Sequence, residues 1–495
     1  GIAPSLTWFA GPNTKATLAY YHYETDGIPD YGLPLTSRNQ LDSTVGVGVR
    51  LPVDVDPDNF YGLLARDFQK TKVDRGTFTI EHNFGNGWVL SNVARYSKDW
   101  NDYIVTNPDD SAGNVVNGLV WRNTKSRNSV SESFADALNL SGVFETGSIG
   151  HSISIGAEYS KATQHNRGYT VATGNRNCLI EGLASHNCTT LDGPDPTDSW
   201  NGSITQAATA SEVDAEDFSL YAFNTITIVP QLLLNGGVRW TTYNTSSPTL
   251  NAGAAYKTEF WSWQGAVIFK PTEQTSLYFS YANSKSPPGT TVGDGGQNLS
   301  AGTSAQAPQS FENWEIGAKA ELLDGALMLT GALFQVNRDN ILQVDDSEIV
   351  NSIQAARIKG FELGAAGRAG PVSMTVGYAY LDGKQTEGAT AGLILPQTPK
   401  HNFSGTVSIE VTPQFRIGGG AYHSSKRYAD NTNLIWSDGY WRFDANATYD
   451  INDHIGVRVN VQNVTDERYI NKLRNPHFAV PADGRRAMVS LLLRY

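Results

Sequence analysis

The sequence YWRFDANATYD, from Tyr440 to Asp450, alternates between two kinds of side chain. One face carries Trp441, Phe443, Ala445, Ala447 and Tyr449, and the other carries Arg442, Asp444, Asn446, Thr448 and Asp450. A β-strand turns successive side chains to opposite faces, so this stretch predicts a strand with one apolar face and one polar face. The same alternation returns in Gly456–Asn463 and in Val489–Tyr495, which ends the chain. Consecutive strands of about ten residues with this pattern are typical of a transmembrane barrel.

Working outward from this stretch, we count about nineteen strands, joined by connections of two kinds. One kind is tight, such as Gly85-Asn86-Gly87 and Asp324-Gly325. The other kind is long and polar. The long connections cover 26–64, 107–117, 167–212, 245–259, 286–309, 340–353, 383–399, 426–438 and 469–484. This sorting predicts an all-β, antiparallel transmembrane barrel with short periplasmic turns and long extracellular loops. Two predicted strands, Arg66–Phe84 and Gly118–Phe144, exceed the length of a membrane crossing, so we expect them to project above the membrane.

Composition supports a β-rich membrane protein. The 495 residues include 48 glycines, 22 tyrosines and 11 tryptophans, and the net charge is -12. Mean hydropathy is -0.34, and no run of eighteen apolar residues occurs, which excludes transmembrane helices. The alternative is a large soluble β-protein, such as a propeller or a β-helix, but no fixed repeat period is present. The acidic balance argues against nucleic acid as a partner.

Cys178 and Cys188 are the only two cysteines. Two isolated cysteines are too few for a structural zinc site, whereas a disulfide between them would cross-link the polar loop that contains both. We therefore expect a disulfide and a compartment outside the cytoplasm.

Six motifs, in order along the chain, give the sequence a resemblance to the TonB-dependent outer-membrane siderophore receptors. They are Ile2–Trp8, Phe311–Lys319, Ile358–Glu362, Pro399–His401, Asn463–Tyr469 and the closing strand from Gly484-Arg485-Arg486 to Tyr495. Within that family, Ile28–Pro34, Asn59–Gly62 and Arg66-Asp67 are most similar to the catecholate-type branch.

The resemblance implies further parts that the sequence does not contain. The family has a signal peptide, a TonB box and a globular plug ahead of a barrel of about twenty-two strands. We expect residues 1–495 to be the barrel domain without the plug and the first three strands. The implied partners are the TonB–ExbB–ExbD complex, acting through the plug, together with outer-membrane lipid and lipopolysaccharide. We expect a monomer in the outer membrane of a Gram-negative cell.

No phosphate loop, metal-ligand cluster or nucleophile–histidine–acid arrangement is evident, so we expect a binding protein and not an enzyme. The acidic pairs Asp109-Asp110 and Asp345-Asp346 are interpreted as solvated loop charge. We expect no covalent cofactor and no resident metal. The resemblance implies a ferric siderophore as the transported ligand, through non-covalent binding.

A ferric catecholate is bulky, aromatic and anionic, so its site requires cations and flat rings near the extracellular loops. Each candidate could instead be a girdle aromatic or half of a structural ion pair. The candidate ligand-binding residues are Trp121, Arg122, Lys426, Arg427, Tyr428, Trp436, Lys472, Arg474 and Phe478.

The arginines on the predicted lumen face have a different interpretation. We expect Arg239, Arg416, Arg442 and Arg458 to pair with acids on neighbouring strands, such as Glu315, Glu362, Glu410 and Asp444, or to face the plug. The sequence leaves the cargo open between a catecholate siderophore and haem, cobalamin, a glycan or a hydroxamate siderophore. A passive porin is the alternative in another functional class.

Overall fold

The computed structural model describes residues 1–37, 49–110, 112–248, 254–288, 306–344, 350–474 and 478–494. Its main element is one antiparallel sheet, in which nineteen long strands follow each other in chain order and the short β10 is added to β7. The nineteen strands are β1 (Ser5–Phe9), β2 (Thr14–Gly27), β5 (Phe68–Asn83), β6 (Val89–Asp109), β7 (Leu119–Thr146), β8 (Ile149–Asn166), β12 (Ser211–Val229), β13 (Leu232–Ser247), β14 (Ala254–Thr272), β15 (Thr275–Ser286), β16 (Gln309–Leu322), β17 (Leu327–Val344), β18 (Val350–Ala369), β19 (Val372–Gln385), β20 (His401–Thr412), β21 (Phe415–Ser424), β24 (Tyr440–Asp450), β25 (Ile455–Gln462) and β28 (Arg486–Leu493).

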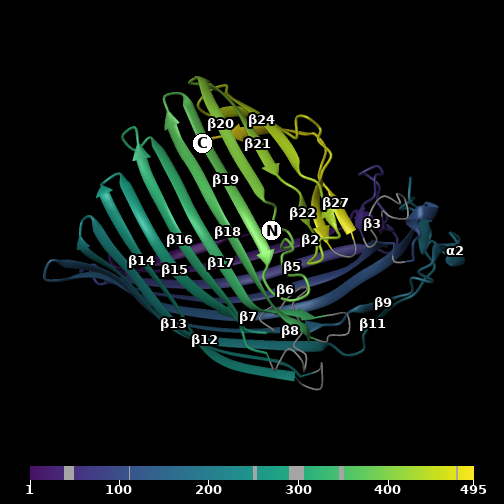
Figure 1. The fold of residues 1–495 in the computed structure, drawn as a ribbon, viewed down its shortest axis with the longest axis horizontal. Helices are drawn as coiled ribbons and strands as arrows, with labels where there is room; N and C mark the ends of the chain where they lie inside the picture. The colour runs from purple at the N-terminus through teal and green to yellow at the C-terminus, as the bar shows by residue number, and fades with distance from the viewer. Residues whose placement is uncertain are drawn as a thin grey trace.

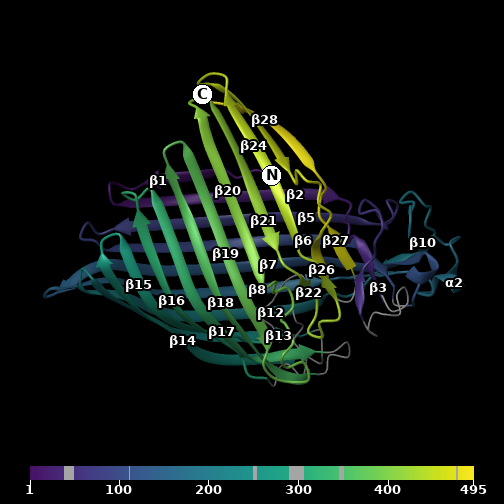
Figure 2. The same cartoon turned by 45° about the horizontal axis from the view of Figure 1, so that its top comes forward.

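The sheet curls into a barrel wall, with tight turns at one end and the long connections at the other (Figures 1 and 2). Strands β1 and β28 are its two edges, and no pairing joins them within the described residues. No helix among these residues is both long enough and apolar enough to cross a membrane.

The predicted alternation of faces is confirmed. On β24, Trp441, Phe443 and Tyr449 are 45%, 41% and 50% exposed, whereas Thr448 is buried. The register places His423 and then Phe403 beside Trp441 on the same face. On β28, Val489, Leu491 and Leu493 are the most exposed side chains of their face. Because these apolar residues point away from the interior, the outer surface of the sheet is built for lipid.

Strand positions also agree with the prediction, except at the loop ends. Strand β24 begins and ends where the alternation in Tyr440–Asp450 predicts. Strands β17 and β18 continue into the predicted loop 340–353, and β19 continues to Gln385. These ladders rise above the membrane, where both faces meet water, so no apolar face marks them in the sequence. Asp345-Asp346 and Tyr495 lie outside the described residues.

The face assignment predicts opposite responses from adjacent residues of β24. Ala445→Arg puts a cation into lipid and should lower the free energy of unfolding by about 2–4 kcal/mol. Asn446→Arg, on the lumen side, should change it by less than about 1 kcal/mol. Urea unfolding in lipid vesicles measures both, and equal costs at the two positions would contradict the assignment.

The long connections pack together into one layer, which we call the loop cap (residues 26–37, 49–67, 110, 112–118, 167–210, 386–400, 425–439, 469–474 and 478–484). Its small elements are β3 (Leu33–Ser37), β4 (Arg50–Pro52), the 3₁₀ turn η1 (Val115–Asn117), β9 (Tyr169–Val171), α2 (Cys178–Glu181), β10 (Cys188–Thr190), β11 (Ile204–Gln206), β22 (Arg427–Tyr428), β23 (Trp436–Ser437), β26 (Ile470–Arg474) and β27 (Phe478–Pro481).

Segments from both ends of the chain meet in the cap. Strand β27 pairs with β3, so Ala479 lies opposite Leu33. Leu35, Ile435, Leu473 and Ala479 form one of two buried apolar clusters there. The cap is therefore a packed unit that holds the loops in fixed positions at the barrel mouth.

Candidate ligand site at the barrel mouth

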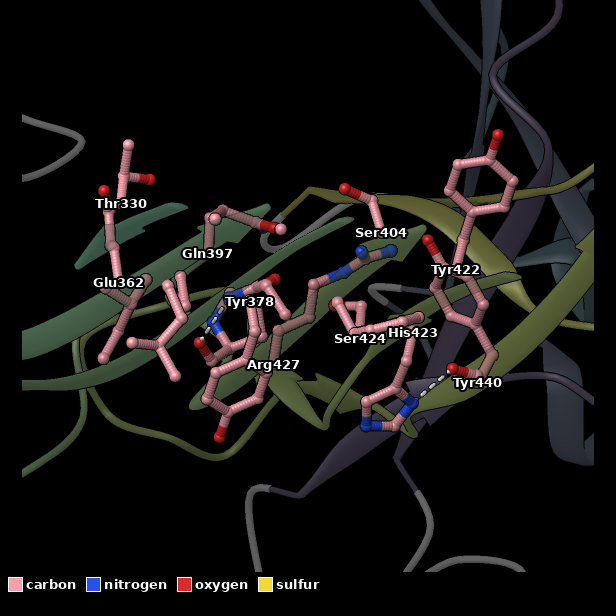
Figure 3. A pocket seen from close by; sticks show the side chains of 18 residues that line it. Thr330, Glu362, Tyr378, Gln397, Ser404, Tyr422, His423, Ser424, Arg427 and Tyr440 are labelled. Atoms are coloured by element: carbon pink, nitrogen blue, oxygen red, sulfur yellow. Dashed lines mark hydrogen bonds between the residues drawn. The ribbon is translucent and has the colours of Figure 1, made fainter. Parts of the chain in front are cut away.

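Three hollows surround the two-stranded β22–β23 sheet where the loop cap meets the barrel wall. The largest, of about 860 Å³, lies against β17 to β21 (Figure 3). The second, of about 750 Å³, lies between the 429–432 turn and β26. The third, of about 320 Å³, lies beside β23 and β4. Together they provide space for a bulky ligand next to the predicted basic and aromatic residues.

The largest hollow has a polar lumen wall. Glu362, Ser404 and Tyr422 point inward because they alternate with the outward-facing Leu363, Phe403 and His423. In Figure 3, Arg427 lies between the Glu362 side of the hollow and the Tyr422 side. The sequence analysis did not single out these inward residues, although the period-two alternation alone places Tyr422 in the lumen.

Arg427 ties the β22–β23 sheet to β26. Its Nη2 donates to the carbonyls of Ile470 and Asn471, and the second of these bonds is 2.7 Å long. Gln397 makes a parallel link, because its backbone N–H donates to Tyr428 O at 2.8 Å and its Nε2 donates to Leu473 O at 2.7 Å. Three loops are thus joined through two residues. Among the described residues Arg427 makes no ion pair, and Glu362 is the acid that lines the same hollow.

Lys426 is exposed and lies against two rings. Its Nζ is 3.9 Å from the centre of the Trp436 ring and 5.2 Å from that of Tyr428. The rings meet edge to face with centres 6.5 Å apart. A cation over aromatic faces gains a modest attraction while its remaining N–H donors stay free. The structure therefore gathers Lys426, Tyr428 and Trp436 into one cation-and-ring cluster.

Lys472 and Arg474 line the second hollow and are exposed. Neither makes an ion pair with any part of the chain that the structure describes; residues 475–477, next to Arg474, are outside it. Asp430 is the acid in the same hollow. These two cations add to Lys426 and Arg427, and the three hollows are also lined by the acids Glu362, Asp54, Asp438 and Asp430, so cations and acids lie side by side at the mouth.

Two predicted ligand residues have structural positions instead. Phe478 is 3% exposed and stacks on Tyr31 with ring centres 4.3 Å apart, so it packs inside the cap. Arg122 is fully buried. Its guanidinium donates to Tyr61 O at 2.9 Å, to Asp195 O at 2.8 Å and to Asp198 Oδ2 at 2.8 Å. These internal partners occupy the guanidinium, so Arg122 is part of the framework that holds the cap together.

Trp121 also supports the disulfide loop. Its Nε1 donates to Thr173 O at 2.8 Å, which anchors that loop to β7. Trp121 and Arg122 therefore lie with the 167–210 loop, and the structure does not bring them into the cation-and-ring cluster.

Cys178 and Cys188 are joined by a disulfide, with Cα atoms 5.7 Å apart. The bond connects α2 to β10 and closes the tip of the 167–210 loop. Asn114 holds the same tip, because its Oδ1 accepts from the backbone N–H of Cys178 at 2.9 Å.

Glu181 makes this loop tip sensitive to acid. Hydrogen bonds from the Asn187 amide, the Asn175 backbone N–H and the Ser185 hydroxyl lower the pKa of its carboxyl. A lowered folded-state pKa stabilises the folded loop above the unfolded pKa of about 4.3, and the stabilisation is lost as pH falls through the folded value. Hydrogen exchange at α2 and β10 should therefore accelerate at acidic pH relative to β7. Glu181→Gln should remove most of that pH dependence; an unchanged dependence would contradict the role of Glu181.

The interpretation of Asp110 as solvated charge is wrong. Asp110 is 6% exposed and accepts from Thr36 Oγ1 and from the Val115 backbone N–H, both at 2.8 Å. Burial raises the pKa of the Asp110 carboxyl. Its hydrogen bonds connect β3 to η1, so it is part of the internal framework of the cap.

Three of the four lumen arginines pair with acids, mostly not with the predicted ones, and Arg458 makes no ion pair among the residues that the structure describes. The sequence alone does not identify these partners, because the strand register, including the bulges near the turns, decides which side chains meet. The observed pairs are Arg239–Glu158 at 2.6 Å, Arg416–Asp450 at 3.0 Å and Arg442–Asp444 at 3.0 Å, while Glu410 binds Arg368 at 2.7 Å and Glu315 accepts from the Tyr278 hydroxyl at 2.5 Å.

Comparison with known proteins decides the family. The model of the TonB dependent receptor-like β-barrel matches residues 6–464. The chain belongs to the TonB-dependent receptor family. The chain is similar to the probable TonB-dependent siderophore receptor PiuA of Acinetobacter baumannii, at 35% identity over 100% of this chain and 70% of the relative. The catecholate siderophore receptor Fiu of Escherichia coli is 27% identical over 100% of this chain and 69% of the relative.

Solved structures agree with this assignment of the receptor. The crystal structure of PiuA superimposes with a TM-score of 0.93 at 33% identity, covering 100% of this chain and 74% of that one. Fiu in its closed form gives a TM-score of 0.83 at 24% identity, covering 99% of this chain and 73% of that one, which shows a shared fold. The receptor is an outer-membrane β-barrel protein, and membership of this family replaces the passive-porin alternative.

Proposed function

We propose that this receptor imports a ferric siderophore of the catecholate type across the outer membrane. The observation that carries the proposal is the cation-and-ring cluster of Lys426, Tyr428 and Trp436, beside Lys472 and Arg474, at the mouth of a TonB-dependent barrel. Two relatives with similarity along the whole chain are named as siderophore receptors, one of them for catecholates.

The chemistry of the mouth suits such a cargo. A ferric tris-catecholate carries negative charge on a shell of flat rings. Ammonium and guanidinium groups offer charge-assisted hydrogen bonds to its oxygens, and Trp436 and Tyr428 offer ring faces. The hollows around β22–β23 are in the size range of small-molecule sites. Hydroxamate siderophores and cobalamin lack this combination of negative charge and aryl rings.

Transport in this proposal requires no bond to be made or broken. The loop cap binds the ligand, the plug closes the lumen, and the TonB–ExbB–ExbD complex supplies energy through the plug. The receptor acts as a monomer and is not an enzyme.

Uptake in cells tests the proposal. The full-length receptor is produced in a strain that lacks its own siderophores and catecholate receptors, and radioactive iron is supplied as a ferric catecholate, as a ferric hydroxamate or as haem. Uptake should occur with the catecholate alone and should disappear when TonB is deleted. Equal uptake from the hydroxamate or from haem would overturn the catecholate assignment.

A further inference from the structure

The third hollow at the mouth, beside β23 and β4, has the opposite charge balance from the second. The charged side chains that line the third hollow are two carboxylates, Asp54 and Asp438, and one guanidinium, Arg468. Those that line the second hollow are two cations and one carboxylate. Each hollow therefore has one charge in excess, which is negative in the third hollow and positive in the second.

The two carboxylates of the third hollow are accessible to a ligand. Asp54 and Asp438 are exposed, and neither side chain makes an ion pair or a hydrogen bond with another described residue. Among the same residues, no group of three or more histidine, cysteine, aspartate or glutamate side chains is arranged to hold a metal ion. The excess negative charge therefore suits an organic cation better than a metal.

A buried hydroxyl in the same hollow also lacks a partner. Ser437 is 4% exposed and lines the hollow, yet its Oγ has no hydrogen bond within the part of the chain that the structure describes. It lies opposite Arg427 in the β22–β23 sheet, and Arg427 reaches the carbonyl of Ile470, which also lines the hollow. Directly opposed residues share one face of a sheet, so Ser437 points to the hollow. Because an unpaired buried hydroxyl is costly, it marks a place for a polar group of a ligand.

The walls of this hollow include two aromatic rings. Trp436 lines it and also belongs to the cation-and-ring cluster, where Lys426 lies over its ring. Tyr469 lines it too, and stacks on Tyr440 with ring centres 3.8 Å apart. Aromatic faces attract ammonium groups. Because Trp436 is shared, a ligand bound beside the cluster can extend a side arm into the third hollow.

We propose that the third hollow binds a protonated amine on an arm of the siderophore. The ammonium group lies between Asp54 and Asp438, donates to Ser437 Oγ and faces the Trp436 ring, while the anionic iron complex lies beside the cations of the mouth. A hollow of about 320 Å³ is at the small end of the range for ligand sites, so it takes an arm and not the whole ferric complex. This inference rests on the proposed function and adds that the catecholate cargo carries a basic amine.

Two ligands that differ in one charge test this inference. Isothermal titration calorimetry is carried out on the full-length receptor in detergent, with a ferric tris-catecholate that carries one primary amine arm and with its N-acetylated form. The unmodified receptor should bind the amine form about tenfold more tightly, because the ammonium group gains charge-assisted hydrogen bonds. Asp54→Asn/Asp438→Asn should reduce this affinity ratio to about one, and should change the affinity for the acetylated form by less than about threefold.

The matched control removes two acids from the same loop. Asp56 and Asp58 are exposed and line none of the three hollows. Asp56→Asn/Asp58→Asn makes the same change in net charge and should keep the tenfold ratio. Ser437→Ala removes only the unpaired hydroxyl, so it should lower the ratio about threefold without loss of folding.

Equal affinities for the two forms in the unmodified receptor would overturn the inference, as would a tenfold ratio that persists in Asp54→Asn/Asp438→Asn. Equal loss of the ratio in the control variant would show that long-range charge, and not the hollow, sets the preference. Binding of neither ligand would instead overturn the catecholate assignment itself, and this inference with it. If the double variant does not fold, as judged by heat-modifiable mobility on a gel, the single Asp438→Asn variant decides the outcome by the presence or absence of a reduced ratio.

Discussion

Replacing Lys426, Lys472 and Arg474 together by alanine is expected to weaken the binding of a ferric tris-catecholate by about 100-fold to 1,000-fold. Each cation can form a charge-assisted hydrogen bond worth about 1.5–3 kcal/mol, and losses at neighbouring residues do not add in full. The folded barrel should be unaffected, because none of the three makes an ion pair with the described chain. Isothermal titration calorimetry in detergent measures the affinity.

The matched control removes the same number of cations from other surfaces. Lys15 and Lys98 are exposed and ion-paired on the barrel wall, and Lys270 lies next to the β14–β15 turn. Alanine at these three positions should change the affinity by less than about threefold, through long-range charge alone. Similar losses in the two triple variants would show that net charge, and not the mouth cluster, governs binding.

Arg122→Met is expected to open the loop cap. The substitution leaves Asp198 without its guanidinium partner, and the carbonyls of Tyr61, His186 and Asp195 lose their donor. Removing one partner of a buried ion pair typically costs about 3–5 kcal/mol. Because the barrel ladders do not depend on Arg122, the loss should be confined to the cap. Hydrogen exchange should accelerate by about 100-fold or more in residues 61–67 and 186–198 and remain unchanged in β12 to β16.

Two further variants test whether the lost contacts of Arg122 cause the faster hydrogen exchange in the cap. Lys125→Met removes an exposed cation three residues along β7 and should leave exchange in the cap unchanged. Arg122→Lys keeps the charge but cannot reach all four acceptors, so its effect should be intermediate. A cap that exchanges normally in Arg122→Met would contradict the structural role assigned to this residue and would reopen its assignment as a ligand contact.

The sequence predicted the barrel well because lipid imposes a pattern on every strand. Alternation in Tyr440–Asp450 identifies both the strand and its outward face. The alternation ends at the membrane surface, because both faces of a strand meet water above it. The sequence therefore did not predict the extensions of β17 and β18 above the membrane.

The positions of the candidate ligand residues were predicted less well than the strands, since residue type does not reveal the direction in which a side chain points. Trp436 and Lys472 line hollows at the mouth and Lys426 lies against Trp436, and their role as ligand contacts stays a prediction. Arg122 and Phe478 have the same chemistry but are turned into the cap by contacts with distant loops. Such contacts, which join residues far apart in the chain, leave no local signal in the sequence.

Anomalous X-ray diffraction at the iron absorption edge tests the central claim most directly. Crystals of the full-length receptor are soaked with a ferric tris-catecholate, and the iron position is read from the anomalous difference map. We predict a single strong peak at the mouth, among the hollows lined by Trp436 and Lys472 and beside Lys426. An iron peak over the disulfide loop near Cys178, or no peak at the mouth under saturating ligand, would contradict the proposed site.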